Sequence, residues 1–322
     1  MTKARGAGRR LASFATSLLV ASLVVFLLLN LLPGDVAQVI LGNNADAASV
    51  EALRREMGLD RSLLVRYLVW LGGMLTGNLG TSALTGESVA SLIAPKFGAT
   101  LWLVLFGMTL AIASALPLGM YSALNRRKLS GQLVSGVAQV GLAIPAFLAG
   151  MLLVILFAVR LRWLPANGYV NLLDDPLGWA RHLLLPAVSL ALVQGAVLTR
   201  YVRNAFIDVL NEDYFRTARS IGWTERKAMR RHGLRNAGLQ LVTVLGLQLA
   251  TLLVGAIVVE SVFVLPGLGS LLLKQVANRD LPVVQSIVMI LVALVLLINA
   301  VVDLLYLAID PRLRTRDGEV AE

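Results

Sequence analysis

The chain of 322 residues contains no cysteine and only two histidines, His182 and His232. Without cysteine there is no disulfide and no thiolate ligand for a metal, and two histidines so far apart in the sequence offer little to a metal cluster. Charged residues are also scarce, since they make up 15% of the chain, where a soluble domain carries roughly a quarter. Together with a hydrophobic fraction of 57% and a mean hydropathy of +0.76, this scarcity indicates a protein embedded in a membrane.

The motifs of nucleotide-binding and hydrolytic enzymes are missing as well. The sequence has no G-x-x-x-x-G-K-[ST] phosphate loop, no nucleophile elbow, no H-E-x-x-H and no clustered pair of carboxylates. We therefore expect no enzymatic activity and no cofactor on this chain. If the protein takes part in active transport, the energy must come from an ion gradient or from a separate ATPase chain.

Long apolar runs are what the sequence has instead. A helix needs about 20 mostly apolar residues to cross roughly 30 Å of hydrocarbon at a rise of about 1.5 Å per residue. Six windows are long enough, which predicts an all-α polytopic membrane protein with six transmembrane helices. The windows are about Leu11–Leu32, Ala99–Leu124, Leu133–Val159, Leu183–Leu210, Leu239–Leu265 and Val283–Ile309.

The first window follows four cations, as the core of a cleavable signal sequence would. Its apolar run is longer than the roughly 7–15 residues of a signal core. The residues that follow, Asn30–Asp35, also have no A-x-A-like cleavage site. We expect this window to remain as an uncleaved first span.

The lysines and arginines are distributed unevenly between the two sides of the membrane. With the N-terminus inside, the inner segments hold 19 of the 29 cations. Five of the remaining cations lie in the long outer loop Pro33–Phe97, where acidic residues outnumber them. The positive-inside rule therefore places both termini in the cytoplasm.

The loop Pro33–Phe97 is the one sizeable outer segment, and its sequence favours two short helices. Asp46 can cap the first helix, which Gly58 ends. Asp60 can cap the second, which we expect to end before the glycine pair at positions 72 and 73. The two helices either pack on the transmembrane core as a cap or contact an external partner.

Two prolines and several polar residues interrupt the apolar windows. Pro117 and Pro145 remove backbone donors and should kink their helices. Polar side chains in lipid need partners, so they face the helix bundle or a wet cavity. Helix packing explains most of them, and a minority is expected to line a substrate path. The candidates for this path are Gln139, Gln194, Thr243, Gln248, Thr251 and Gln285.

A basic segment, Arg216–Ala237, lies between the fourth and fifth windows and contains seven cations and one acid, Glu225. Nucleic-acid binding, a membrane-surface anchor and docking to a partner protein are all compatible with this charge. Its inner location removes the argument for nucleic acid, because an inner loop is basic for topological reasons alone.

Local signals divide this segment into two parts. The first is a short helix, which we call the rod, and the second is a basic helix leading into the fifth window, which we call the ramp. Residues 211–213 offer an N-cap for a helix Tyr214–Ile221, which would be roughly 12 Å long. Gly222 fits the left-handed position that ends a helix, and Thr224 can cap a second helix that leads into the fifth window. A rod of this kind suits a groove on another protein, and the alternative is a solvated loop whose cations touch anionic lipid. The exposed surface of the rod is expected to include Phe215, Ala218, Ile221 and Trp223.

From Tyr214 onward the sequence reads Y-F-R-T-A-R-S-I-G-W-T-E-R-K-A-M-R-R-H-G-L-R-N-A. This segment resembles the cytoplasmic EAA loop of permeases from binding-protein-dependent ABC importers. With Gly222 as the anchor, residues 216–218 replace E-A-A, and His232, Leu234 and Arg235 stand at the Ile, Leu and Pro positions of the general pattern. The oligopeptide/dipeptide/nickel branch typically reads R-T-A-R-x-K-G and R-H-A-L-R-N-A, which this chain follows closely.

Further segments resemble the first-permease type of the same branch, in the same order along the chain. They are L-L-P-G-D at 31–35, M-G-L-D at 57–60, G-N-L-G-T-S at 77–82, V-E-S-V-F-V-L-P-G-L-G at 259–269 and N-R-D-L-P-V-V-Q at 278–285.

This resemblance implies the type I ABC importer permease fold in a bacterial inner (plasma) membrane. The implied partners are a second related permease chain, two ATPase subunits that carry ATP and Mg, an extracytoplasmic solute-binding protein and membrane lipid, with no nucleic acid. The implied substrate is a peptide, and nickel complexes, glutathione, opines and oligosaccharides are alternatives. The residues implied to couple to an ATPase subunit are Tyr214, Phe215, Arg216, Thr217, Ala218, Arg219, Ile221, Gly222 and Trp223.

The expected organisation has three parts. Residues 1–97 form an N-terminal transmembrane helix with an extracytoplasmic helical loop, 98–317 form a five-helix permease core whose coupling loop is about 211–237, and 318–322 form a tail. An ion-coupled secondary transporter would instead need ionisable groups at mid-membrane and inverted repeats, and neither is evident. A membrane scaffold without transport activity is a third class, which an uptake assay on a deletion strain would separate from a permease.

Overall fold

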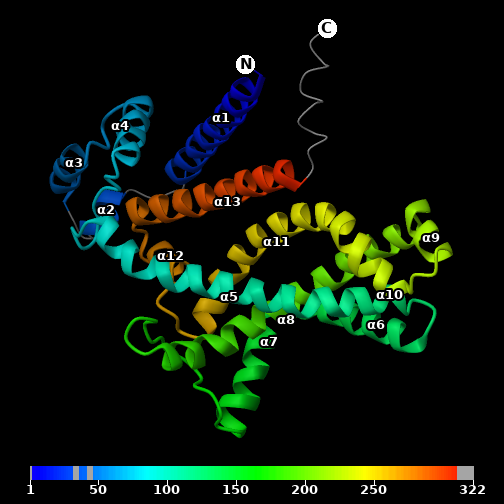
Figure 1. The fold of residues 1–322 in the computed structure, drawn as a ribbon. Helices are drawn as coiled ribbons and strands as arrows, with labels where there is room; N and C mark the ends of the chain where they lie inside the picture. The colour runs from blue at the N-terminus through cyan, green and yellow to red at the C-terminus, as the bar shows by residue number, and fades with distance from the viewer. Residues whose placement is uncertain (1, 32–35, 42–45, 310–322) are drawn as a thin grey trace. The chain divides into compact units, whose positions relative to one another are not determined.

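The computed structural model describes residues 2–31, 36–41 and 46–309 of the chain. Within these ranges the regular structure is helical, apart from an isolated β-bridge between Thr81 and Ser88 (Figure 1). In chain order the elements are α1 (Thr2–Asn30), α2 (Val36–Leu41), α3 (Ala47–Glu56), α4 (Leu63–Leu75), α5 (Val89–Leu124), α6 (Leu129–Ala143), α7 (Ala146–Leu153), the π-helical η1 (Val154–Arg160), α8 (Pro176–Asn211), α9 (Asp213–Ser220), α10 (Glu225–Ala228), the π-helical η2 (Met229–Gly233), α11 (Leu234–Val262), α12 (Leu268–Asn278) and α13 (Leu281–Ile309).

Helices of membrane-spanning length occur at five of the six predicted windows, in α1, α5, α8, α11 and α13. The third window is a broken pair, because α6 and the helix Ala146–Arg160 meet at an angle of 100°. If this bent pair is one span, the count is the predicted six. The all-α polytopic fold is thus confirmed, and which face of the membrane the termini occupy stays a prediction.

Proline has different effects at three positions in these helices. Pro145 is the N-cap of α7, and Ile144 before it is extended with φ −93° and ψ 120°. This conformation follows from the clash between a proline ring and a helical predecessor, so the predicted kink at Pro145 is confirmed. By contrast, α5 continues through Pro117 and α8 continues through Pro186.

The loop Pro33–Phe97 contains the two predicted short helices, α3 and α4, and one of the two predicted caps is correct. Asp46 caps α3 by accepting a hydrogen bond from the Ser49 backbone N–H at 3.2 Å, and Gly58 follows the helix with φ +66°. Hydrogen bonds from the Ser49 hydroxyl and from the Ser49 backbone N–H lower the pKa of the Asp46 carboxyl. The prediction for α4 is wrong at both ends, because its N-cap is Ser62 instead of Asp60 and the helix runs through the glycine pair to Leu75.

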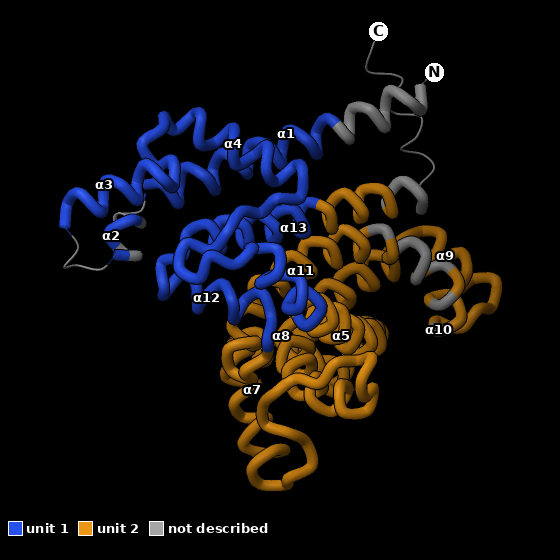
Figure 2. The backbone as a smooth tube through the Cα atoms, turned by 90° about the vertical axis from the view of Figure 1, so that its left-hand side faces the viewer, with its two compact units in different colours: residues 1–99, 266–296 blue, residues 100–265, 297–322 orange. Residues whose placement is uncertain are grey.

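The chain forms two compact units (Figure 2). Unit 1 comprises residues 1–99 and 266–296, and unit 2 comprises residues 100–265 and 297–322. The division of the chain into 1–97, 98–317 and 318–322 remains a prediction.

The core of unit 1 joins the start of α5 to α12 and α13. Its buried residues are Val89, Ile93, Leu268, Leu271, Val283 and Ile287. The helix α12 was missed in the sequence, where its leucines lie between two longer apolar windows. Beside this core, the buried carboxylate of Asp280 accepts hydrogen bonds from the Ser82 hydroxyl at 2.5 Å and from the Ala83 backbone N–H at 3.1 Å.

Asp280→Ala is expected to destabilise unit 1 by about 2 kcal/mol, because it leaves a buried hydroxyl and a backbone N–H without their acceptor. The measurement is thermal unfolding of the full chain in detergent, followed by tryptophan fluorescence. Asp60→Ala, which removes an exposed acid from the same unit, is the matched control and should leave the midpoint unchanged. Equal midpoints for the two variants would contradict the structural role of Asp280.

In unit 2 the long helix α8 packs against α6, α7 and α11. A second buried carboxylate, Glu260 of α11, accepts a hydrogen bond from the Thr100 hydroxyl of α5 at 2.6 Å. Both ends of α11 therefore connect to other helices of the unit, since its beginning also contributes Ala237 and Leu241 to a buried cluster with α8.

Candidate coupling site

The segment between α8 and α11 folds into a short helix followed by a turn, as its sequence predicts. The helix α9 covers Asp213–Ser220, one residue earlier at each end than the predicted rod. Glu212 is its N-cap without a side-chain hydrogen bond, and Asp213 lies in the first turn, where a negative charge is favourable to the helix dipole.

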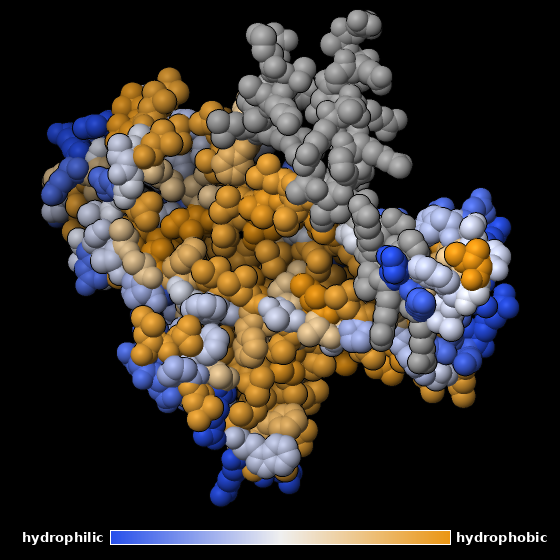
Figure 3. Space-filling model, viewed as in Figure 1, coloured by the Kyte–Doolittle hydropathy of each residue, from blue (hydrophilic) through white to orange (hydrophobic). Residues whose placement is uncertain are grey.

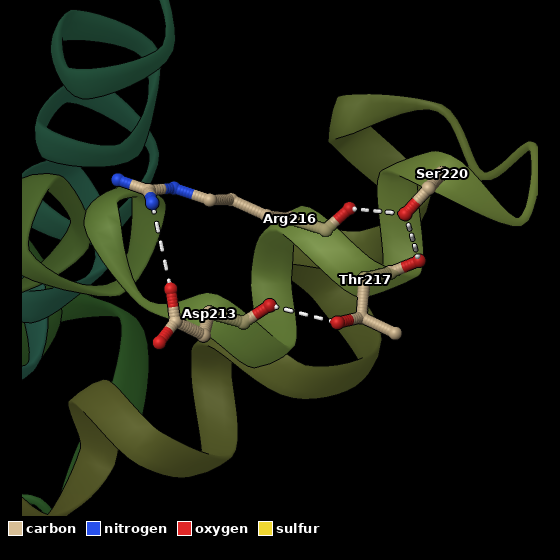
Figure 4. Close-up of polar contacts among 4 residues, drawn as sticks. All are labelled: Asp213, Arg216, Thr217 and Ser220. Carbon is tan, nitrogen blue, oxygen red and sulfur yellow. Dashed lines mark hydrogen bonds and ion pairs between the residues drawn. The ribbon is translucent and has the colours of Figure 1, made fainter.

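Polar contacts on α9 are made mostly within the helix itself (Figure 4). The Thr217 hydroxyl donates to the Asp213 carbonyl at 3.0 Å, and the Ser220 hydroxyl donates to the Arg216 carbonyl at 3.0 Å. The Arg216 guanidinium lies 3.4 Å from the Asp213 carboxylate in an exposed ion pair, which contributes little to stability. Figure 4 shows these side chains projecting outward from the helix.

The opposite face of α9 is anchored in the core of unit 2. Phe215 and Ala218, three residues apart and so on one side of the helix, are 2% and 6% exposed. They belong to a buried cluster with residues of α5, α8, α10, η2 and α11, namely Ala123, Val202, Ala205, Phe206, Val209, Ala228, Met229, Ala237 and Leu241. The expectation that Phe215 and Ala218 are exposed is therefore wrong, because the core of this chain already covers them.

Gly222 ends α9 in the way its sequence position predicts. It adopts φ +92°, and its backbone N–H donates to the Arg219 carbonyl at 3.0 Å. The next residue, Trp223, donates its N–H to the Ala218 carbonyl at 3.2 Å. These two bonds form a Schellman motif, with Gly222 in the left-handed position and Trp223 packed against the buried cluster.

Charged side chains hold the turn against the next helix. The Lys227 ammonium lies 5.2 Å and the Arg231 guanidinium 5.5 Å from the centre of the Trp223 ring, at distances typical of cation–π contacts. Arg219 forms an ion pair with Glu225 at 3.1 Å. In the sequence, the cations of this segment indicated only its orientation in the membrane, and the contacts show that three of them also hold the turn at Gly222 in place. The side chains of Arg226, Arg230, His232 and Arg235 lie outside the described residues.

The predicted ramp begins as expected and then changes helix type. The Thr224 hydroxyl accepts a hydrogen bond from the Lys227 backbone N–H at 3.4 Å, which confirms Thr224 as the cap of α10. After one turn, the helix becomes the π-helical η2, which leads into α11. Figure 3 shows mostly hydrophilic surface over α9 and α10 and hydrophobic surface over the long helices of this unit.

Exposed residues on and after α9 form the face that remains free. Tyr214 and Ile221 are 38% and 68% exposed, and Arg216, Thr217, Arg219 and Ser220 are exposed beside them. We call these six residues the outer face of α9. An aromatic ring, an aliphatic side chain and two arginines are suited to a protein groove.

Among the six candidates for a translocation path, Gln194 and Gln248 contact each other, and whether the six line a path stays a prediction. The side chains of Gln194 and Gln248 are buried and connect α8 to α11, and the Gln194 amide donates both to the Gln248 side-chain oxygen at 2.5 Å and to its backbone carbonyl at 2.9 Å. The hydrogen bond between them supplies the partner that a buried polar side chain needs between packed helices. Gln139, Thr243 and Thr251 are exposed in unit 2, and Gln285 lines a cavity in unit 1.

The class of protein follows from comparison with known families. Residues 115–315 match the family of binding-protein-dependent transport system inner membrane components, and residues 5–104 match the N-terminal domain of such membrane components. The chain is a polytopic inner-membrane permease and belongs to this family. It is a permease subunit of an ABC importer.

Individual relatives are similar along almost the whole chain. The glutathione transport system permease protein GsiC of Salmonella typhimurium is 41% identical over 306 residues, which are 95% of this chain and 97% of the relative. GsiC of Escherichia coli K12 is 40% identical over the same shares. Among solved structures, an inward-facing form of the MetNI methionine ABC transporter has a TM-score of 0.59 at 19% identity, covering 68% of this chain and 96% of the other. That structure supports the type I ABC importer permease fold.

Proposed function

We propose that this permease imports short peptides, glutathione among them, and that α9 is its coupling helix to an ATPase subunit. The substrate class is supported by the relatives, whose names specify glutathione transport. Glutathione is itself a tripeptide, so it falls within the peptide class that the sequence motifs imply. The secondary-transporter alternative is set aside because the chain belongs to an ABC importer family.

The observation that carries the coupling role is the two-faced character of α9. Phe215 and Ala218 fix one face to the core shared by α5, α8 and α11, while the outer face is free. A displacement applied to the outer face therefore reaches three long helices through close-packed side chains, which have little compressibility. A loop fixed only by its cations would lack this connection.

The mechanism that fits this arrangement is alternating access. Closure of two ATPase subunits around ATP and Mg moves the docked α9, and the attached helices tilt to open the path outward. The second permease chain, the two ATPase subunits and the extracytoplasmic solute-binding protein complete the transporter. The cation distribution supports a cytoplasmic location for α9, on the side of the membrane where ATP is available.

Uptake of labelled glutathione and of unrelated tripeptides tests this function in a strain that lacks the chain. We expect uptake to be lost on deletion and restored by the plasmid-borne chain, and excess unlabelled glutathione to compete with the label. The purified chain alone is expected to bind no ATP, whereas its complex with the ATPase subunits hydrolyses it. Unchanged uptake in the deletion strain contradicts the transport proposal, and ATP binding by the chain alone contradicts the separate ATPase.

A further inference from the structure

Unit 1 contains a cavity of about 330 Å³ that plays no part in the coupling mechanism proposed above. It is lined by the end of α1, by the loop between α3 and α4, by α4, by the loop that follows α4 and by the start of α13. Phe26, Leu29 and Val69 contribute an apolar wall, and Arg61 and Arg66 contribute two positive charges. No acidic residue is among the described residues that line it.

Two buried hydrogen-bond donors on the cavity wall have no partner within the described part of the chain. They are the indole N–H of Trp70 and the side-chain amide nitrogen of Gln285. A buried donor without an acceptor is costly, so it indicates a group that the protein alone does not supply. Burial also lowers the pKa of Arg66, and a bound anion would offset this cost.

The walls of the cavity are fixed by hydrogen bonds, which keeps the space open. After α4, the Asn78 backbone N–H donates to the Gly73 carbonyl at 2.8 Å, and the Ser286 hydroxyl donates to the Leu79 carbonyl at 3.1 Å. On the other side, the ring of Tyr67 packs edge-on against Phe26 with centroids 5.4 Å apart. The cavity is therefore preformed.

The helices around the cavity expose apolar side chains that water would not favour. In α4, a helix of 13 residues, no residue is buried, and Leu64 is 67% exposed. In α1, Leu28 is 61% exposed. An apolar helix too short to span is stable in the membrane interface, where tyrosine and tryptophan are also enriched. The first span ends and the sixth span begins at the cavity, which puts both ends on one face of the membrane at headgroup level.

We propose that this cavity binds the phosphate group of an anionic phospholipid, whose acyl chains lie along the exposed apolar faces of α1 and α4. A phosphodiester has enough acceptor oxygens for two guanidinium groups and two N–H donors. The apolar wall distinguishes a lipid from free phosphate, which has nothing to place against Phe26 and Leu29. Bound there, the lipid joins α1 and α4 to the start of α13.

The test uses the full-length chain, delipidated in detergent and titrated with phosphatidylglycerol or phosphatidylcholine, with bound lipid counted by native mass spectrometry. We expect phosphatidylglycerol to bind at least about tenfold more tightly. The double variant Arg61→Gln/Arg66→Gln should weaken it about 30-fold, since each cation near anionic lipid contributes roughly fivefold. Trp70→Phe, which keeps a ring but removes the donor, should weaken it several-fold.

The matched control is Arg54→Gln/Arg55→Gln, which removes two cations from α3 that do not line the cavity. It should change the affinity less than about twofold. Equal binding of the two lipids, or an equal loss in the control, overturns the proposal. Binding of inorganic phosphate or glycerol 3-phosphate as tight as that of phosphatidylglycerol overturns the lipid assignment in favour of a soluble anion. If the double variant does not fold, Trp70→Phe decides, because unchanged lipid affinity in that variant overturns the proposal.

Discussion

Ile221→Asp is expected to abolish docking of the ATPase subunit and with it substrate uptake, while the chain still folds and inserts. Ile221 is 68% exposed at the end of α9 and belongs to no described buried cluster. Its replacement therefore costs the isolated chain little. In the complex, the same change removes an apolar anchor and puts a charge into the contact, which for a hot-spot residue costs about 2–4 kcal/mol. Affinity for the ATPase should fall at least about 30-fold.

Co-purification of the ATPase subunits with the tagged chain measures this effect directly. Leu173→Asp is the matched control, because it makes the same kind of change at a leucine that is 90% exposed before α8. The control should retain the ATPase at the normal ratio. If Ile221→Asp also retains it, the outer face of α9 is not the docking surface.

Where the local sequence decides the structure, the sequence predicts it well. The left-handed turn at Gly222, the cap at Thr224 and the break at Pro145 each follow from the chemistry of one residue and its near neighbours. The apolar windows likewise predict the spans, because a bilayer requires a minimum length of apolar helix. The same reasoning succeeds for Asp46, whose side chain caps its own helix.

Features that depend on packing partners distant in sequence could not be predicted in the same way. The burial of Phe215 depends on Phe206 of α8 and Leu241 of α11, and nothing in its own helix indicates them. Composition gives no direction for the 100° bend at Pro145, since a proline sets where a helix breaks but not the angle. The contact between Gln194 and Gln248 is a further example, because the apolar windows do not reveal which polar residues of α8 and α11 face each other. The set of residues expected to line a translocation path stays a prediction.

Gly222→Val is expected to uncouple ATP hydrolysis from transport in a chain that remains folded. The backbone at Gly222 has φ +92°, and a β-branched residue there is strained by roughly 1–3 kcal/mol or more. An added Cβ would meet no atom within 4 Å, so the effect comes from the backbone and not from a steric clash. Relief of the strain would turn φ negative and break the bonds from Gly222 to Arg219 and from Trp223 to Ala218. The outer face of α9 would then point in a different direction relative to its anchor.

A graded series of substitutions separates this conformational effect from simple loss of glycine. Asparagine tolerates the left-handed region better than valine does, so Gly222→Asn should keep most of the uptake, whereas Gly222→Val should lose about tenfold or more. Uptake and substrate-stimulated ATPase activity are measured together in proteoliposomes, because uncoupling lowers uptake per ATP hydrolysed, whereas unfolding lowers the amount of inserted chain. Normal uptake together with normal substrate-stimulated ATPase activity in Gly222→Val would show that the turn at Gly222 does not transmit force. Equal losses in the two variants would show instead that space around Gly222 is required by the docked partner, since this chain alone leaves that space open.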